Sequence, residues 1–395
     1  MSVSVPLTAS YDVADLRQKE FPVSAKVAYL NHAGTSPLPR RSHEAMSRLS
    51  EGLMLDPTET FPALMEKMHE LQESLRTLIN APSAEDIALV QSTSLAINLA
   101  AGSLPWERGQ NLIFYASEFP SNAYPWMHFA QQHGVEVRLV GAGTPGLTLD
   151  MVERAADSKT RLVAASAVQF FSGHRTDLQA IGDFCHQRGI LFSVDAIQSV
   201  AHSPIDVQKM HIDICASGGQ KSLMGPMGLG FLYVRRELCE HMSPVFVSDN
   251  STVDWMHWLK YDLTPLPGAG RFGTGTFNAI GVAGLLESVK LLQGLGIPAI
   301  DTYTTALISD AKKKLEADGY EVVTPADHGP IVTFRAAPDD AGTTQIINAL
   351  QKQHVHVVKH WDAPKTAHIR ASVHCYNTVE DIDRLIEALR EVKKS

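Results

Sequence analysis

A single lysine stands in an otherwise uncharged stretch of the sequence. The segment ASGGQKSLMGPMGLGFLYV, residues 216–234, contains Lys221 among glycines, small polar residues and apolar residues, and the next charged residue is Arg235. A lysine on a solvated surface usually has charged neighbours. Lys221 is therefore either an isolated surface side chain or a reactive amine, and amines of the second kind form covalent bonds with carbonyl compounds.

Two further groups lie where predicted strands end. The triplet STS, residues 92–94, leads directly into a predicted helix and offers hydroxyls and free N–H groups to an anion at the positive helix end. Taken alone, it is also the pattern of an ordinary helix cap. The segment VDAIQ places Asp195 at the end of an apolar strand. A carboxylate there is either a helix cap or the partner of a buried cation, and both readings stay open.

A lysine, an aspartate and an anion cradle at three strand ends together indicate pyridoxal phosphate. The lysine would hold this cofactor as a Schiff base, and the aspartate would keep the pyridine nitrogen protonated so that the ring accepts electrons. The helix N-terminus would bind the phosphate. In a parallel sheet, ligands bind at the carboxyl ends of the strands, where these groups would meet.

The elements that must position these groups alternate along the chain. Short β-branched runs predict buried strands at residues 86–92, 111–117, 135–140, 160–168, 190–196, 214–218 and 229–234. Amphipathic segments lie between most of them and end at glycine or another helix breaker. This order predicts an α/β fold in which helices flank both faces of a seven-stranded, mainly parallel sheet.

The pattern changes after about residue 285, where long helical segments are followed by strands and a final helix. We expect an N-terminal segment, 1–30, that packs on the small domain and the pocket. A large cofactor-binding domain would cover 31–284, and a smaller α+β domain 285–395. A chain of 395 residues with 44% hydrophobic residues can bury the core that this arrangement needs.

Composition argues against several classes of partner. A net charge of −9 gives no footprint for nucleic acid or an anionic membrane, and no apolar run approaches the length of a membrane span. The four cysteines contain no CxxC pair, so neither a zinc site nor a redox motif is predicted. The C-terminal histidines lack a familiar metal-binding spacing, and we predict no metal. With no signal peptide in the first residues, we expect a cytoplasmic protein.

Six motifs in order resemble those of a known family. They are YLNHAGTSPLP, SEFPSNAYPW, SVDAIQSVAH, SGGQKSLMGPMGLGFLYV, RFGTGTFN and IRASVHCYNTVEDIDRL, and they cover nearly the whole chain. Their series is similar to that of the class V aminotransferases, which have fold type I and use pyridoxal phosphate. This family includes cysteine desulfurases, isopenicillin N epimerase-like proteins, kynureninases and related C–S lyases.

The resemblance implies roles for particular residues. Lys221 matches the Schiff-base lysine, Asp195 the partner of the pyridine nitrogen, and Gln198 the residue near the phenolic oxygen of the cofactor. Phe119 matches the ring that stacks on the pyridine face. The positions matching contacts to the cofactor phosphate are Thr93, Ser94 and Gln220.

The same resemblance implies a substrate site and a partner. Arg370 matches the arginine that clamps the carboxylate of an amino-acid substrate. Asn31 and His32 lie in the segment that helps to close the substrate pocket, and His360 and Trp361 lie in a loop that we expect to line it. Family dimers complete each phosphate site with a glycine and a threonine of the neighbouring subunit. Gly275 and Thr276 match that pair, so a homodimer is implied.

The sequence departs from the family patterns at several positions. Gly273 replaces the acid of the family's RFE, which leaves the pairing of Arg271 open. The form SGGQK makes Ser217 only a candidate phosphate contact. Ala167 stands where the desulfurases have a pocket-facing asparagine. Gln169 points the same way two residues on, and we expect it to take over that polar role in binding the cofactor.

The predicted reaction begins when a substrate amine displaces Lys221, which then acts as the general base at Cα. We favour β-elimination from a sulfur-containing amino acid. The framework is desulfurase-like, yet the loop VVKHWDAPKTAH has no cysteine to carry a persulfide, and Cys375 fits a packed turn better. Transamination and epimerisation remain alternatives, as does a cofactor-binding regulator without turnover.

Overall fold

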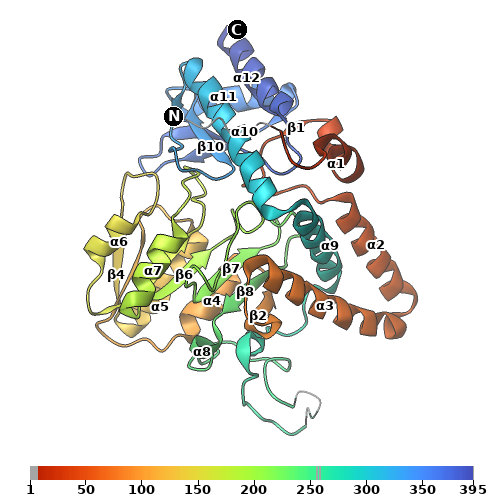
Figure 1. The fold of residues 1–395 in the computed structure, drawn as a ribbon, viewed down its shortest axis with the longest axis vertical. Coiled ribbons are helices and arrows are strands. Elements are labelled where there is room, and N and C mark those ends of the chain that lie inside the picture. The colour runs from red at the N-terminus through yellow and green to blue at the C-terminus, as the bar shows by residue number, and fades with distance from the viewer. Residues whose placement is uncertain (1–7, 255–256, 258, 395) are drawn as a thin grey trace.

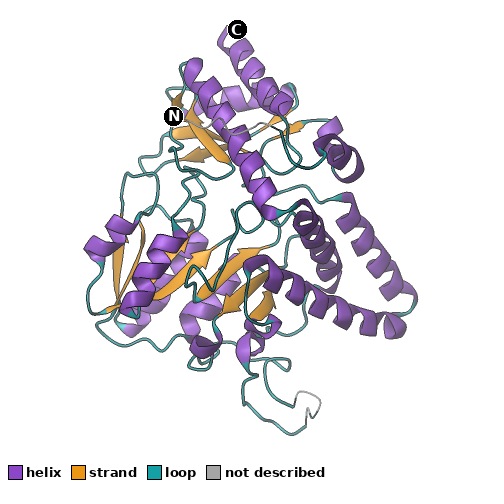
Figure 2. Cartoon of the chain, in the orientation of Figure 1, coloured by secondary structure: helices purple, strands orange, loops and turns teal. Residues whose placement is uncertain are grey.

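The larger of two bodies is built on a seven-stranded sheet (Figure 1, lower part; orange in Figure 2). The computed structural model describes residues 8–254, 257 and 259–394. The strands are β2 (Ile87–Val90), β3 (Asn111–Tyr115), β4 (Glu136–Val140), β5 (Thr160–Ser166), β6 (Leu191–Asp195), β7 (Ile214–Gly218) and β8 (Gly230–Val234). Their order is β2-β8-β7-β6-β5-β3-β4, and only β8 runs antiparallel to its neighbours. The predicted α/β fold with a mainly parallel sheet is confirmed.

Helices cover both faces of this sheet because the strands are apolar on both sides. In β5, Val163 and Ala165 belong to one core cluster, whereas Leu162 and Ala164 belong to the other, as the period of two requires. The first cluster includes α3 (Pro57–Ile79), α6 (Leu149–Ala155), α7 (Leu178–Arg188) and α9 (Ala279–Leu295). The second includes α4 (Thr93–Ser103), α5 (Tyr124–His133) and α8 (Arg236–Cys239). The helix α2 (Arg40–Leu55) packs on α9 and α3.

The smaller body is an antiparallel sheet covered by helices (Figure 1, upper part). The sheet order is β12 (Val358–Trp361), β13 (Ala367–Ser372), β10 (Ile331–Arg335) and β9 (Glu321–Val322). Its helices are α10 (Ile297–Ala317), α11 (Asp340–Lys352) and α12 (Val379–Lys394). The boundary expected at residue 285 falls inside α9, whose Leu285 and Leu292 are buried in the larger core.

The N-terminal segment lies on the smaller body and then passes to the larger one. Its helix α1 (Val13–Glu20) is held by Arg17, which donates to Asp381 at 2.7 Å. The strand β1 (Ala28–Tyr29) pairs with β11 (Val355–His356). The short 3-10 helices are η1 (Pro22–Ala25), η2 (Ala84–Asp86), η3 (Pro120–Asn122) and η4 (Gly268–Phe272).

Membrane-spanning potential is confined to a bent pair of helices. Within the described part of the chain, no single helix has the length and apolar character to cross a bilayer, and α9 and α10 meet that condition only when taken together across a bend of 80°.

Three buried imidazoles meet where the N-terminal segment and the two bodies join. The ring centroid of His374 lies 4.0 Å from that of His202 and 5.4 Å from that of His32. His374 Nδ1 accepts from the Cys375 N–H, so its Nε2 carries the proton that is donated to the Ser222 carbonyl at 2.9 Å. Burial lowers the pKa of all three, in His374 to about 4. This histidine cluster therefore packs as neutral rings directly behind Lys221.

The histidine cluster should make stability depend on pH. Because these imidazoles bind protons near pH 6.5 when unfolded but only at lower pH when folded, their contribution to the unfolding free energy falls below about pH 7. One such histidine loses about 1.4 kcal/mol by pH 5.5. Between pH 7.5 and 5.5, the free energy of unfolding measured with urea should fall by about 1 kcal/mol less in His202→Asn than in the wild type.

The exposed His133 supplies the matched control for this measurement. We expect His133→Asn to keep the pH dependence of the wild type, because that side chain is solvated in both states. Equal pH dependences for wild type and His202→Asn would contradict the assignment of neutral buried rings.

Candidate active site

Lys221 lies in the turn after β7, at the carboxyl edge of the sheet. Its Nζ is 5.2 Å from the centroid of the Phe119 ring, which follows β3. Burial lowers the pKa of Lys221 to about 8, and Arg370 lowers it further, whereas Asp195 opposes the shift. An amine with this pKa is partly neutral near physiological pH, as a nucleophile or base must be.

Asp195 is the last residue of β6 and is buried. It accepts a hydrogen bond from Ile197 N at 3.0 Å, so it caps the turn that follows the strand. Its charge also raises the pKa of Lys221. Burial raises the pKa of its own carboxyl to about 6, against the hydrogen bond from Ile197 and the charge of Lys221.

Glu118 is a second acid near the site, half-buried, that the sequence reasoning missed. Its carboxylate accepts from Ser166 N at 3.0 Å and from Ser166 Oγ at 2.6 Å. Burial raises its pKa to about 7, and Asp195 adds to the shift. The available signal was its place directly before Phe119, in a motif otherwise made of apolar and neutral polar residues.

The anion cradle forms at the start of α4. Ser92 Oγ caps the helix by accepting from Leu95 N at 3.1 Å. Among the described residues, the N–H groups of Thr93 and Ser94 have no acceptor. Thr93 Oγ1 accepts from Gly218 N at 2.8 Å, which ties the helix start to the end of β7. Two free N–H groups at a positive helix end suit a phosphate.

Neighbouring residues shape this cradle. A Cβ built at Gly218 would lie 2.5 Å from Gln220 Oε1 and 3.3 Å from Thr93 Oγ1, so Gln220 and Thr93 pack closely over this glycine. Ser94 Oγ lies 2.7 Å from Ser121 Oγ. Ser217 is completely buried and donates to the Gly218 carbonyl at 3.0 Å.

Arg370 extends from β13 of the smaller body toward Lys221. Its Nη1 donates to the Phe170 carbonyl at 2.7 Å, while its buried Nε has no partner among the residues that the structure describes. Burial lowers the pKa of this arginine to about 10. A buried guanidinium without an anionic partner is costly, and an anion bound beside it would remove that cost.

Aromatic rings line the space near Arg370. Phe170 meets Phe119 edge to face at 5.1 Å and His360 at 5.8 Å. Burial lowers the pKa of His360 to about 4, and Arg370 and Lys221 add to the shift, so this ring is neutral. The expectation for Trp361 is wrong. Its side chain leaves the opposite face of β12, and its Nε1 donates to Asp340 at 2.7 Å.

Four other predicted site residues contact protein groups in the structure. Gln169 donates to the Ser117 carbonyl, and its amide oxygen accepts from two backbone N–H groups of its own loop. This anchoring of the loop differs from the pocket-facing role expected of it. His32 belongs to the histidine cluster rather than to the pocket wall. Asn31 folds over Gly34 with a buried, unpaired Oδ1, and Gln198 donates to the Ala33 carbonyl at 3.0 Å.

The segment with Gly275 and Thr276 lies at the surface of the chain. Thr276 is exposed, and Gly275 has a positive φ of 83°. Asn250 holds the segment by donating to the Gly275 carbonyl and accepting from its N–H. Arg271 is buried and donates to the carbonyls of Cys239, Met242 and Leu266, so it needs no acidic partner at 273. A side chain at Gly273 would lie 2.8 Å from Asn250 Oδ1.

The donor set fits pyridoxal phosphate. Lys221 could hold the aldehyde carbon, Asp195 the pyridine nitrogen, Thr93 and Ser94 the phosphate, and Phe119 could cover the ring. Among residues 8–254, 257 and 259–394, no group of His, Cys, Asp and Glu could hold a metal ion.

Known proteins are similar over almost the entire chain. Residues 28–385 match the family model "Aminotransferase class-V". A probable cysteine desulfurase of Methanothermobacter thermautotrophicus is 29% identical over 392 residues, which cover 95% of this chain and 97% of that protein. The apo structure of cysteine desulfurase from Thermococcus onnurineus NA1 has a TM-score of 0.88 at 25% identity, covering 98% and 100% of the two chains.

A further solved structure shares the fold. The complex of the cystine C–S lyase C-DES with cysteine persulfide superimposes with a TM-score of 0.84 at 22% identity, covering 94% of this chain and 99% of that one. The matches extend through both bodies and include the segments that carry Lys221, Asp195 and Arg370. The chain therefore belongs to the class V aminotransferase family and is a pyridoxal-phosphate-dependent enzyme.

Proposed function

We propose that this enzyme cleaves the C–S bond of a sulfur-containing α-amino acid by β-elimination and uses no thiol of its own. The observation that carries an amino-acid substrate is Arg370. Its buried Nε lacks a partner among the described residues, and its charge lowers the pKa of Lys221. A substrate carboxylate would supply the missing anion, and the same contact would bring Cα toward the lysine.

Each side chain of the site has its own role in the proposed reaction. Pyridoxal phosphate, when bound, supplies the sink for the electron pair left at Cα. Lys221 Nζ takes the proton from Cα, which its lowered pKa allows. Asp195 holds a proton at the pyridine nitrogen. The start of α4 binds the phosphate, and Phe119 and Phe170 exclude water from the reacting face.

The thiols support a persulfide-free route. All four cysteines have side chains with no exposed surface: Cys185, Cys215, Cys239 and Cys375. Burial raises the pKa of each, to about 11 in Cys239 and about 12 in Cys185. A buried, protonated thiol is a poor nucleophile. The apolar wall around Phe170 also suits a sulfur-bearing side chain, because sulfur makes favourable contacts with aromatic rings.

We further propose a homodimer in which Gly275 and Thr276 reach the phosphate site of the neighbouring subunit. Exposed apolar side chains lie on the preceding surface segment: Val245, Phe246, Val247, Leu259, Tyr261 and Leu263. Leu259 is 95% exposed and Tyr261 92%, which is unusual for such side chains unless another protein surface covers them.

The test of the reaction is a product panel. The holoenzyme is incubated with cysteine, cystine, alanine and longer amino acids, and sulfide, pyruvate, other keto acids and inverted amino acids are measured. Elimination predicts pyruvate and a sulfur product in equal amounts. Keto acid formation at the expense of the cofactor aldehyde would instead indicate transamination, and inverted amino acid would indicate epimerisation.

Lys221 should carry the cofactor. Hydride reduction of the holoenzyme followed by peptide mapping should place the pyridoxyl label on Lys221, because its amine is partly neutral and faces Phe119. The Lys221→Ala variant should lose the label while Lys209→Ala, an exposed control, keeps it. Label on a different lysine would refute the assignment.

Arg370 should matter far more than any cysteine. Removing one partner of a buried charge pair costs roughly 2–5 kcal/mol, so Arg370→Ala should lower kcat/KM roughly 30-fold or more. Arg335 serves as the control because it lies on the same sheet and donates to the Ala337 and Pro338 carbonyls. The Arg335→Ala variant should change kcat/KM less than about twofold.

The same kinetic assay tests the thiols. Each single Cys→Ala variant that folds should retain turnover, because no buried thiol takes part in the proposed reaction. Loss of turnover in Cys375→Ala with an unchanged circular dichroism spectrum would restore a persulfide mechanism.

A further inference from the structure

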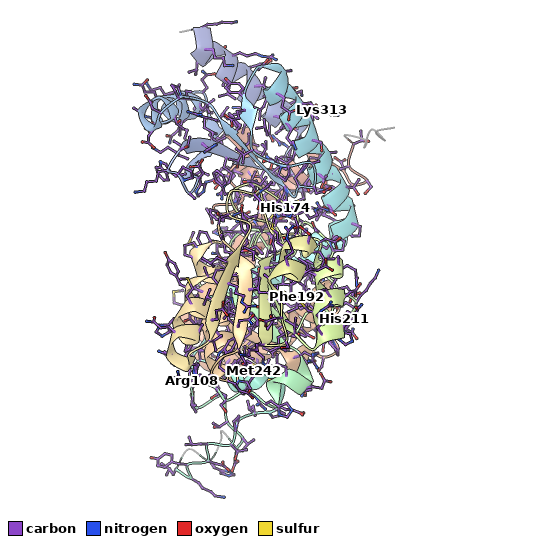
Figure 3. All side chains as sticks on the ribbon, turned by 90° about the vertical axis from the view of Figure 1, so that its left-hand side faces the viewer. Arg108, His174, Phe192, His211, Met242 and Lys313 are labelled. Atoms are coloured by element: carbon purple, nitrogen blue, oxygen red, sulfur yellow. The ribbon has the colours of Figure 1, made fainter. Side chains whose placement is uncertain are left out.

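A second pocket lies at the opposite edge of the seven-stranded sheet from Lys221. It has a volume of about 380 Å³ and is lined by residues that precede β3, begin β5 or follow α7. Because these strands are parallel, their amino ends face away from the edge that carries Lys221 and Asp195. Figure 3 shows Arg108 of this pocket at the far end of the larger body, whereas His174 lies beside the smaller body.

Four cations line this pocket without acidic partners. Arg108, Lys159 and Arg161 make no side-chain hydrogen bond or ion pair with any residue that the structure describes, and Arg188 only stacks on Phe184 at 4.0 Å. Among the described residues, the buried Arg161 Nε has no acceptor. A guanidinium left without an acidic partner is unfavourable, so the cationic lining of this pocket favours an anion.

Two carboxylates beside the pocket share one arginine. Asp157 accepts from Asn111 at 2.8 Å, and Arg138 pairs with both Asp157 and Glu136 at 2.9 Å. The backbone N–H of Lys159 and the side chains of Asn111 and Arg138 hold the pKa of Asp157 near 2. About one negative charge of this group therefore remains beside the pocket.

The remaining negative charge is smaller than the positive charge. Glu107 lines the pocket. The C-terminal ends of α5 and α7 lie beside it: the Gly134 carbonyl at the end of α5 accepts from Gly109 N, and Gly189 at the end of α7 lines the pocket. A helix end carries about half an elementary charge, so the two ends add roughly one negative charge to that of Glu107. With the charge left on Asp157 and Glu136, about one positive charge remains, in a chain whose net charge is −9.

We propose that this basic pocket binds a small multivalent oxyanion of the phosphate type. Guanidinium groups match phosphate oxygens with paired hydrogen bonds, and the three arginines of the pocket suit a pyrophosphate or a phosphate ester. The backbone leaves room for it. Gly109 and Gly189 have positive φ angles of 85° and 65°, and no atom lies within 4 Å of a side chain built at either one. The site is separate from the substrate pocket, so its ligand does not compete with the amino acid.

The test measures binding of inorganic pyrophosphate to the holoenzyme, in which the cofactor already fills the phosphate cradle. Titration calorimetry at constant ionic strength should show one site per chain that remains in the Arg370→Ala variant. The double variant Arg108→Gln/Arg161→Gln should weaken binding at least tenfold. The double variant Lys313→Gln/Lys352→Gln removes the same charge from exposed positions on the smaller body and should bind as the wild type does (Figure 3 labels Lys313).

Further measurements compare other anions and control for variants that fail to fold. Orthophosphate and citrate distinguish a phosphate site from a general polyanion site, and citrate binding as tight as that of pyrophosphate would overturn the phosphate assignment. Arg108→Gln/Lys159→Gln changes only exposed side chains and should also weaken binding, even if Arg161→Gln impairs folding. Absence of binding, equal loss in the Lys313→Gln/Lys352→Gln control, or loss in Arg370→Ala would each refute the proposal.

Discussion

The site depends on two buried cations that the protein leaves without a full set of anions. Lys221 and Arg370 come from different bodies, and each lowers its proton affinity because burial disfavours charge. Asp195 is the acid that attracts Lys221 most directly, and its own pKa is raised by the same burial. A cofactor phosphate and a substrate carboxylate would complete this charge balance. Both ligands are thus attracted by positive charge that the protein itself leaves incompletely paired.

This arrangement requires the two bodies to be held in register. The N-terminal segment does so by pairing β1 with β11 of the smaller body and by donating Ser36 N to the Gln220 carbonyl at 2.8 Å, next to Lys221. The histidine cluster fills the junction with neutral rings, and His374 reaches from the smaller body to the Ser222 carbonyl. The lysine is therefore positioned by contacts on either side of it along the chain.

Departures from the family pattern have local explanations. Arg271 needs no acid at position 273, because three backbone carbonyls accept its hydrogen bonds. Asn250 occupies the space that a side chain at 273 would need. Gln169 serves its own loop rather than the pocket. The role expected of it failed because strand alternation predicts which way a side chain points, but not which neighbours it meets there.

Local signals in the sequence determined the sheet, the helices on both of its faces, and the placing of Lys221, Asp195 and the start of α4 at strand ends. Period-two alternation, caps and breakers act over a few residues and can be read directly. Only the tertiary structure decided that Arg370 meets Phe170, that Glu118 binds Ser166, that three distant histidines pack together, and that Arg108, Arg161 and Arg188 share a pocket. It also packed the apolar face of α9 on the larger core. Such contacts join residues tens to hundreds of positions apart, and no local periodicity encodes which of them will meet.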